Sequence, residues 1–451
     1  MKRMMTVLFA AAAATEVLAA PPDVTGVTVS QDDSRTVTVG YSLSAPAVVT
    51  VDFLTNGVSL MSVDARPTGD IGWVKTGGSG KVIKWRPRKS LPSGLEFRDV
   101  TVRVQAYSAA RQPDYMVVDP ANGWQQFYAT SNDVPGGVLA NADYRGKYLL
   151  LRRIPVAWSE QMLGKPNANW NGNNARRTRH PVMLTNNYYM TVFPVTRGQL
   201  ARAYGWTEWS QDTFTKSPDK TSNWRLRPAE GTAYEDLRGG VADDMIDWPT
   251  TGDAVAEGSV LGKFRANTGI LFDLPTDAQY EIACRAGNEA DFYNGTFVYN
   301  TYDYVACAKR AGWYADNWAD DTVSVPGATQ ANFTHIVGLK EPNGYGLYDM
   351  CGNVRSLCRD WWMEKPGTAN ASTGYVPDYY NPKGPTKAQS ELVGNVYRRV
   401  SHSGHYNESC DLMQTSARNP ETATGKNPDG GAAYIGFRMV CPALNGGMIA
   451  D

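Results

Sequence analysis

An alternation of hydrophobic and polar residues marks the first quarter of the chain. Between residues 24 and 110, β-branched residues alternate with polar ones in short segments, and a period of two is typical of half-buried strands. We predict strands at residues 27–29, 36–39, 48–53, 82–85 and 100–104. Their spacing favours a β-sandwich of the immunoglobulin or fibronectin-III type over residues 21–112. No cluster of catalytic residue types lies in this segment, so we interpret it as a spacer or docking module.

The rest of the chain shows little helical periodicity. Two short helices are predicted, at 196–204 and 276–286, and Pro275 with Thr276 forms a natural start for the second. Most other segments are Asn-, Gly- and Asp-rich loops between short apolar runs. We therefore predict an α+β fold, with one loop-rich domain over residues 113–445 behind the all-β module.

The first twenty residues have the pattern of a secretory signal peptide. Lys2 and Arg3 precede an apolar run that is too short to cross a bilayer, and small residues follow at Ala19 and Ala20. A membrane anchor is the alternative, but Glu16 interrupts the apolar run. We expect a protein that is secreted, periplasmic or at the cell surface, with no transmembrane anchor once residues 1–20 are cleaved.

Composition limits the classes of partner. The 451 residues are 42% hydrophobic and 20% charged, which is ordinary for a globular protein and excludes disorder for most of the chain. Lys and Arg total 44 against 45 acidic residues. Because there is no positive surplus to hold phosphates, we expect no nucleic-acid partner.

Four motifs in the second part of the chain occur in the order of a known family. They are residues 188–196, 274–287 (with Leu-Pro-Thr-Asp-Ala-Gln-Tyr-Glu), 343–354 (Asn-Gly-Tyr-Gly-Leu-Tyr-Asp-Met-Cys-Gly-Asn-Val) and 436–438 (Gly-Phe-Arg). The set resembles the formylglycine-generating enzyme (sulfatase-modifying factor) family. The resemblance implies an irregular C-type-lectin-like fold. From the residues alone, Arg438 in its apolar run is expected to form a buried ion pair or to bind loop carbonyls.

The resemblance also implies a copper site, because enzymes of this family are copper-dependent oxidases that convert a substrate cysteine to formylglycine. Two cysteines five positions apart bind Cu(I) in the family. Counting back from Ala417-Arg418, Cys410 falls on the second position and His405 stands at the first. Cys410 and His405 are therefore the candidate catalytic residues, with His402 as a possible third copper ligand. The alternative is a surface loop with two exposed histidines and a structural cysteine.

A calcium site and a disulfide are implied in the same way. By position, Asp349, Gly352 and Val354 correspond to calcium ligands of the family, but Arg355-Ser356-Leu357 replaces its Trp-Glu-Trp segment. The alternative for Asp349 is a turn residue. Family members often bridge the regions of Cys284 and Cys441, so this pair is the first disulfide candidate. The six cysteines allow 15 pairings, and the others can pair among themselves.

Two classes of function follow. The first is a non-catalytic, secreted module that binds a protein or glycan ligand through the C-terminal loop, since polar and aromatic residues give adaptable contacts. Its candidate contacts are His402, His405, Tyr406, Asn407, Trp361 and Trp362. For the two tryptophans, a place in the core is the alternative. The second class is the copper-dependent oxidase that acts on sulfatase cysteines.

Overall fold

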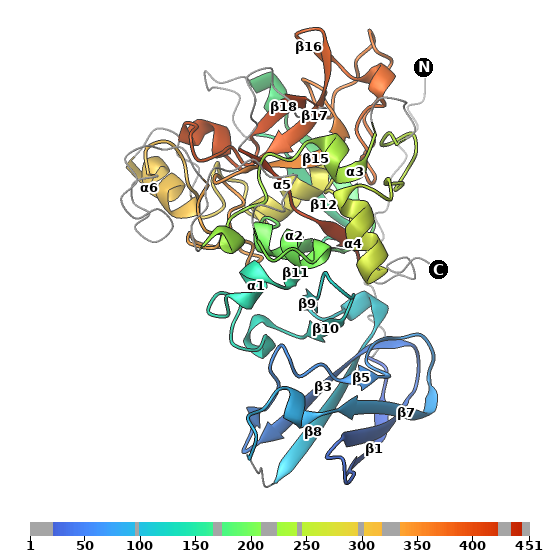
Figure 1. Ribbon diagram of the computed structural model, residues 1–451. Helices are drawn as coiled ribbons and strands as arrows, with labels where there is room; N and C mark the ends of the chain where they lie inside the picture. The colour runs from blue at the N-terminus through green and yellow to red at the C-terminus, as the bar shows by residue number, and fades with distance from the viewer. Residues whose placement is uncertain are drawn as a thin grey trace, which may run out of the picture.

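The computed structural model consists of a smaller all-β part and a larger mixed part (Figure 1). It describes residues 21–94, 99–165, 174–208, 223–240, 246–295, 302–317, 334–422 and 434–443. The predicted signal peptide therefore lies outside the described residues. The predicted α+β class is confirmed, because irregular connections join several small sheets and a few short helices.

The N-terminal part contains two antiparallel sheets. One has the order β1 (Val24–Gln31), β2 (Val37–Leu43), β7 (Gly78–Trp85) and β5 (Thr68–Gly69). In the other, β3 (Ala47–Thr55) pairs with β4 (Val58–Ser59), β6 (Gly72–Val74) and β8 (Val100–Tyr107). Alternate residues of these strands form one core, in which Phe53 stacks on Trp85 at 4.3 Å between ring centroids. Each predicted strand in this region falls on an observed one; the immunoglobulin or fibronectin-III type stays a prediction.

The larger part is built on a five-stranded antiparallel sheet with cores on both faces. The sheet has the order β10 (Gln125–Tyr128), β9 (Tyr115–Val118), β11 (Leu149–Ile154), β14 (Tyr188–Thr191) and β20 (Val440–Pro442). Because side chains alternate along a strand, Tyr188 and Met190 enter one core while Tyr189 enters the other. The last described strand, β20, pairs with β14 and completes the sheet.

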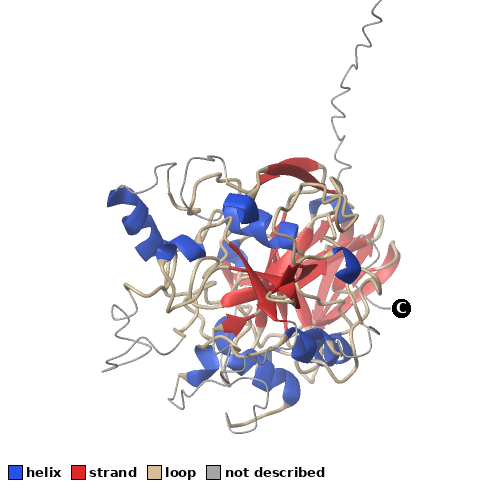
Figure 2. Cartoon of the chain, turned by 90° about the horizontal axis from the view of Figure 1, so that it is seen from above, coloured by secondary structure: helices blue, strands red, loops and turns tan. Residues whose placement is uncertain are grey.

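A second sheet carries the C-terminal loop. Its strands are β16 (Leu392–Val393), β17 (Val396–His402), β15 (Arg355–Trp361) and β19 (Ile435–Gly436), with β18 (Arg418–Thr422) also paired to β17. A hairpin of β12 (Ser159–Leu163) and β13 (His180–Leu184) forms a third, two-stranded sheet. Figure 2 shows the strands gathered at the centre of the view, with the helices around them.

Short helices lie around the sheets (Figure 2). They are α1 (Asp143–Gly146), α2 (Arg197–Tyr204), α3 (Tyr234–Arg238), α4 (Val260–Thr268), α5 (Asp277–Arg285) and α6 (Tyr302–Ala311). The two predicted helices are confirmed as α2 and α5. Thr196 and Thr276 cap them by accepting from the backbone N–H groups of Gln199 and Gln279. None of the described helices is long and apolar enough to cross a bilayer.

Arg438 ties the five-stranded sheet to the loop before β15. Its side chain is fully buried, and its guanidinium donates to the carbonyls of Thr191 (3.0 Å), Val192 (3.2 Å) and Tyr348. Of the two expected roles, the binding of loop carbonyls is therefore confirmed. Hydrogen bonds from a charged donor are among the stronger ones in proteins, and those of Arg438 add to the backbone bonds from Thr191 to Met439 and from Tyr348 to Val192.

We expect Arg438→Met to lower the free energy of unfolding by about 3 kcal/mol, because it removes the charged donor that binds three carbonyls in the interior. Urea denaturation followed by tryptophan fluorescence measures the effect. Arg88→Met, at an exposed position of the sandwich, is the matched control and is expected to change stability by less than about 0.5 kcal/mol. Equal effects of the two substitutions would contradict the role of Arg438.

Candidate functional site

The C-terminal loop spans residues 403–417 and leaves the sheet between β17 and β18. Its two ends, His402 and Arg418, lie directly opposite each other in the antiparallel pairing of these strands. Inside the loop, residues Cys410–Met413 form one turn of 3-10 helix. Both ends of the segment that holds the candidate catalytic residues are thus fixed by strand pairing.

A single carboxylate joins these two ends to helix α5. One oxygen of Asp277 lies 2.6 Å from Nε2 of His402, and the other accepts from Arg418 at 2.6 and 2.8 Å. His402 also stacks on Tyr280, one turn further along α5, at 4.8 Å. Burial would raise the pKa of Asp277, but Arg418 and His402 outweigh it and hold the pKa well below its usual range. The sequence places Asp277 in the first turn of α5, where an acid is favourable, but gives no sign of its partners.

A second buried aspartate lies beside the first with the opposite electrostatic behaviour. Asp360, on β15, is 2% exposed and accepts from the backbone N–H of Asp277 at 2.8 Å. Burial, and then the charge of Asp277, raise the pKa of Asp360 to about 8. At neutral pH the pair therefore consists of one carboxylate and one carboxylic acid.

An internal ion cluster occupies the inside of the loop. Arg355 donates to the carboxylates of Glu408 and Glu421. The same Glu408 accepts from the backbone N–H of His405 at 3.1 Å, and its own carbonyl accepts from the N–H of Ala315 at 2.9 Å. Sequence reasoning treated Arg355 only as part of a degraded motif and did not identify Glu408. The only sequence signal for this ion pair was the opposite charge of Arg355 and Glu408, which lie more than 50 positions apart.

His405 is a packed, neutral side chain. Its ring stacks on Tyr434 at 4.2 Å, and burial followed by the charge of Arg355 lowers its pKa to about 3. Nδ1 accepts from the N–H of Asn407 at 3.2 Å, and Nε2 faces Glu408 at 3.5 Å. Because neighbouring groups contact both nitrogens, the ring has no lone pair directed to a metal.

Cys410 is a partly buried thiol. Burial, followed by the charges of Asp411 and Asp316, raises its pKa to about 11. A metal binds the thiolate, which is scarce here at neutral pH. Among the residues that the structure describes, no group of three or more His, Cys, Asp or Glu side chains is placed to hold a metal ion. The residues at the implied copper position therefore do not fit that ion.

The predicted ligand-binding residues lie at different depths. Trp361, Trp362 and His402 are at most 1% exposed and belong to the interior. The two tryptophans therefore lie in the core, which was the alternative to a role in ligand binding. Trp361 packs against the guanidinium of Arg399 at 3.3 Å. His405 and Tyr406 are also buried, which contradicts the alternative of a surface loop with two exposed histidines. Of the predicted contacts, only Asn407 is exposed.

Residues implied as calcium ligands serve the backbone instead. The carboxylate of Asp349 is fully buried, accepts from the N–H of Gly338 at 2.6 Å and has a pKa that burial raises. Gly352 has φ +81°, and a Cβ there would lie 2.3 Å from the carbonyl oxygen of Trp313. Val354 is buried, and Ser356 brings no charge where a hard cation needs anionic oxygens. This set does not fit calcium, and Asp349 is placed as a turn residue with φ +52°.

The structure does not bring Cys284 and Cys441 together. Cys284 belongs to one core of the five-stranded sheet and Cys441 to the other. The sulfur of Cys284 instead lies 3.9 Å from that of Cys351. Both cysteines of the proposed pair are free thiols here, and the separation of the two cores is the physical reason.

Comparison with known proteins identifies relatives for the larger part of the chain. A family model described as a sulfatase-modifying factor enzyme 1-like domain matches residues 160–443. The formylglycine-generating enzyme of Mus musculus is 32% identical over 175 residues, which are 38% of this chain and 39% of that protein. The enzyme of the same name from Thermomonospora curvata is 29% identical over 198 residues, which are 43% and 54% of the two chains. The chain thus matches about two fifths to one half of the length of these relatives.

Two solved structures are similar at low identity. PvdO from Pseudomonas aeruginosa gives a TM-score of 0.43 at 18% identity, and covers 65% of this chain and 94% of its own. Treponema denticola variable protein 1 gives 0.41 at 22% identity, and covers 65% and 95%.

The two adjacent aspartates give opposite predictions. Asp277→Asn leaves the buried Arg418 without its carboxylate and is expected to lower the free energy of unfolding by about 3 kcal/mol. Asp360→Asn, its matched control, replaces a side chain that is already neutral at pH 7 and keeps an acceptor for the N–H of Asp277. We expect it to be no less stable than the wild type at that pH, as measured by urea denaturation.

The same pair predicts a pH dependence. Folded Asp360 keeps its proton up to about pH 8, whereas an unfolded aspartate loses it near pH 4, so its contribution to stability falls as pH rises between these values. His405 has a folded pKa of about 3, which lies below its unfolded value. Its contribution to stability therefore rises with pH up to about pH 6.5, opposite to that of Asp360. From pH 6.5 to 8, Asp360→Asn should therefore gain up to about 2 kcal/mol relative to the wild type. A constant difference would contradict the shifted pKa.

Cys410 should be the first thiol to react in the folded protein, but slowly. Roughly one molecule in a thousand carries its thiolate at pH 8 when the pKa is about 11. Alkylation by iodoacetamide, followed by peptide mass mapping, should accelerate about tenfold per pH unit between pH 7 and 9. The other five cysteines are buried and serve as internal controls. Fast labelling at pH 7 would contradict the raised pKa.

Proposed function

Because the chain belongs to the sulfatase-modifying factor enzyme 1-like family, we propose that it is an exported ligand-binding module built on this scaffold and not a copper oxidase. The observation that carries the proposal is the state of His405, whose two ring nitrogens contact Asn407 and Glu408. The position that supplies a thiolate in the family is thus used here to hold the loop. Export rests on the pattern of residues 1–20.

The charge cluster around Arg355 supports the same conclusion. Glu408 lies between His405 and Cys410 in the sequence, and its carboxylate is held by Arg355 and by the backbone N–H of His405. A metal-binding histidine is held by a hydrogen bond at one ring nitrogen and keeps the lone pair of the other for the ion; here Nδ1 of His405 accepts from Asn407 and Nε2 faces Glu408. The loop interior uses its charged groups for its own conformation, which suits a rigid surface for recognition.

The exposed part of the loop is the candidate contact surface. Asn407 and Ser409 are exposed, and Glu408 and Cys410 are partly exposed. His402, Trp361 and Trp362, by contrast, are buried. Amide, hydroxyl and carboxylate groups on a fixed backbone suit hydrogen bonding to a protein or glycan ligand.

The alternative function, oxidation of a sulfatase cysteine to formylglycine, is tested directly. We expect no conversion when the purified full chain is incubated with Cu(I) and a Cys-x-Pro-x-Arg peptide, as followed by mass spectrometry. An active formylglycine-generating enzyme with the same peptide is the positive control. Repeated turnover by the wild-type chain would overturn the proposal. His405→Cys, which restores the second thiol, shows whether its absence alone prevents copper binding.

The binding surface is tested by substitution at exposed positions. A ligand is first identified on protein and glycan arrays. Asn407→Ala and Ser409→Ala should each lower the affinity for that ligand by about three- to tenfold, the effect of one lost hydrogen bond. Ser372→Ala, at an exposed position on another loop, is the matched control. Unchanged binding in both loop variants would place the contact surface elsewhere.

A further inference from the structure

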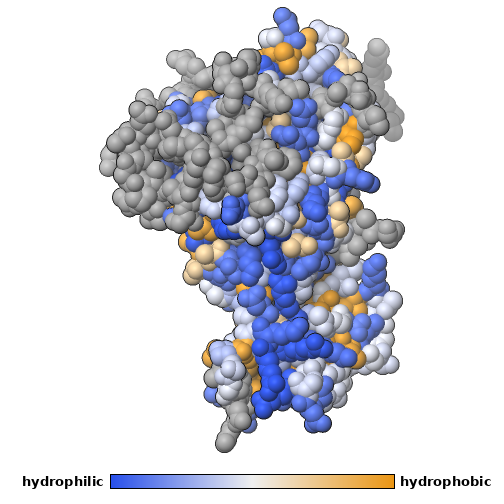
Figure 3. Space-filling view, in the orientation of Figure 1, coloured by the Kyte–Doolittle hydropathy of each residue, from blue (hydrophilic) through white to orange (hydrophobic). Residues whose placement is uncertain are grey.

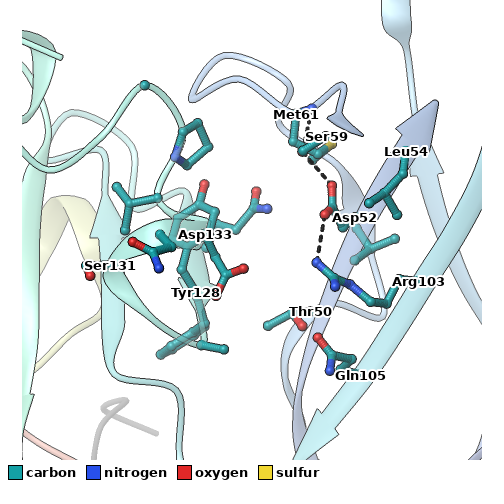
Figure 4. A pocket seen from close by; sticks show the side chains of 18 of the residues that line it. Thr50, Asp52, Leu54, Ser59, Met61, Arg103, Gln105, Tyr128, Ser131 and Asp133 are labelled. Atoms are coloured by element: carbon teal, nitrogen blue, oxygen red, sulfur yellow. Dashed lines mark hydrogen bonds and ion pairs between the residues drawn. The ribbon is translucent and has the colours of Figure 1, made fainter. Parts of the chain in front are cut away.

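A polar cleft lies between the N-terminal sandwich and the five-stranded sheet. It has a volume of about 610 Å³, within the usual range of small-molecule sites. Figure 4 shows Tyr128 and Asp133 on one side of the gap and Thr50, Asp52 and Arg103 on the other. Hydrophilic residues also form a band from the sandwich across this junction on the face seen in Figure 3.

The sandwich contributes a regular row of polar side chains to the cleft. Strands β3 and β8 pair so that Thr50 lies opposite Gln105 and Asp52 opposite Arg103. All four line the cleft, and so does part of the intervening Val51, which also belongs to the sandwich core. The alternation of the two strands thus buries one face and directs the other to the cleft.

The opposite wall carries two buried polar groups that lack partners. Gln126 and Tyr128 lie two positions apart on the edge strand β10 and both line the cleft. They are 2% and 6% exposed. Within the part of the chain that the structure describes, neither the amide oxygen of Gln126 nor the hydroxyl of Tyr128 has a hydrogen-bond partner. Burying such groups unbonded costs free energy, so each is a group beside the cleft that still needs a hydrogen-bond partner, which a ligand or a water molecule can supply.

The charges around the cleft favour an uncharged ligand. Asp52 is paired with Arg103 at 3.0 Å and also accepts from Ser59. Asp133 accepts from the N–H and the hydroxyl of Thr130. Both carboxylates thus have partners within the protein, and the unpaired groups of Gln126 and Tyr128 are a neutral amide and a neutral hydroxyl.

Apolar side chains complete the lining. They are Leu54, Val58, Met61, Val134 and Pro135. A surface with hydrogen-bonding groups beside apolar patches matches a sugar ring, which has hydroxyls at its edge and C–H groups on its faces. We propose that this cleft binds a neutral saccharide, which donates to Gln126 and exchanges hydrogen bonds with Tyr128 and Thr50.

This site is separate from the C-terminal loop. None of its lining residues belongs to residues 403–417, and both domains are needed to form it. It gives the sandwich a function beyond that of a spacer. The proposal stands or falls independently of the function proposed for the loop.

The test uses the full chain with maltotriose, cellotriose and chitotriose as neutral probes and trigalacturonate as an anionic one. Saturation-transfer NMR and titration calorimetry measure binding. We expect at least one neutral trisaccharide to bind, and trigalacturonate to bind more weakly because Asp52 and Asp133 repel it. Tyr128→Phe and Gln126→Met should each raise the Kd about tenfold, the effect of one lost hydrogen bond.

Stability distinguishes this role from a structural one. Tyr128→Phe removes a hydroxyl that has no hydrogen-bond partner among the described residues, so its Tm should stay the same or rise. Tyr188→Phe, the matched control, removes a buried hydroxyl that donates to Gln279 at 2.6 Å; it should lower the Tm and leave the Kd unchanged. Asn407→Ala should also leave the Kd unchanged.

Three results would overturn the proposal. The first is the absence of binding by all neutral probes up to about 10 mM, which would mean that the cleft holds water alone. The second is a Kd that Tyr128→Phe and Gln126→Met leave unchanged. The third is tighter binding of trigalacturonate than of the neutral probes.

Discussion

The Asp277 carboxylate is the interaction on which the C-terminal region depends. One oxygen contacts the last residue of β17 and the other the first residue of β18, so one side chain closes the base of a 15-residue loop. It does so from the start of α5, where the positive end of the helix favours a negative charge. Helix α5, the paired ends of β17 and β18, and the C-terminal loop are therefore held together by the same side chain, Asp277. The neighbouring Asp360 is compatible with it only because its own proton is retained at neutral pH.

Different residues support the scaffold and occupy the implied metal positions. Thr276 still caps α5, and Arg438 still binds the carbonyls before β15. At the implied metal positions, by contrast, side chains that could act as ligands are bonded to the protein itself. His405 contacts Asn407 and Glu408, and Asp349 accepts from Gly338. A fold constrains its supporting contacts more strongly than its site, and this chain follows that rule.

Local patterns in the sequence were sufficient for the local structure. The capped helices at Thr196 and Thr276 and the strands of the sandwich were predictable, because each signal lies within a few residues. The burial of His402 and Trp361 was not predictable, because these side chains are polar or amphipathic and only tertiary packing decides their depth. The partners of Asp277 lie more than 120 positions away. The cleft at β10 depends on how two domains meet, which no single segment encodes.

The pairing of β20 with β14 has a consequence for how the protein reaches its native state. Contacts such as that between Arg438 and Thr191 join positions 247 residues apart, and loops of that length close slowly. Until they close, β14 presents an open sheet edge that can recruit strands from other molecules. Yields during refolding should therefore depend on protein concentration, and a chaperone that shields this edge would favour the monomer.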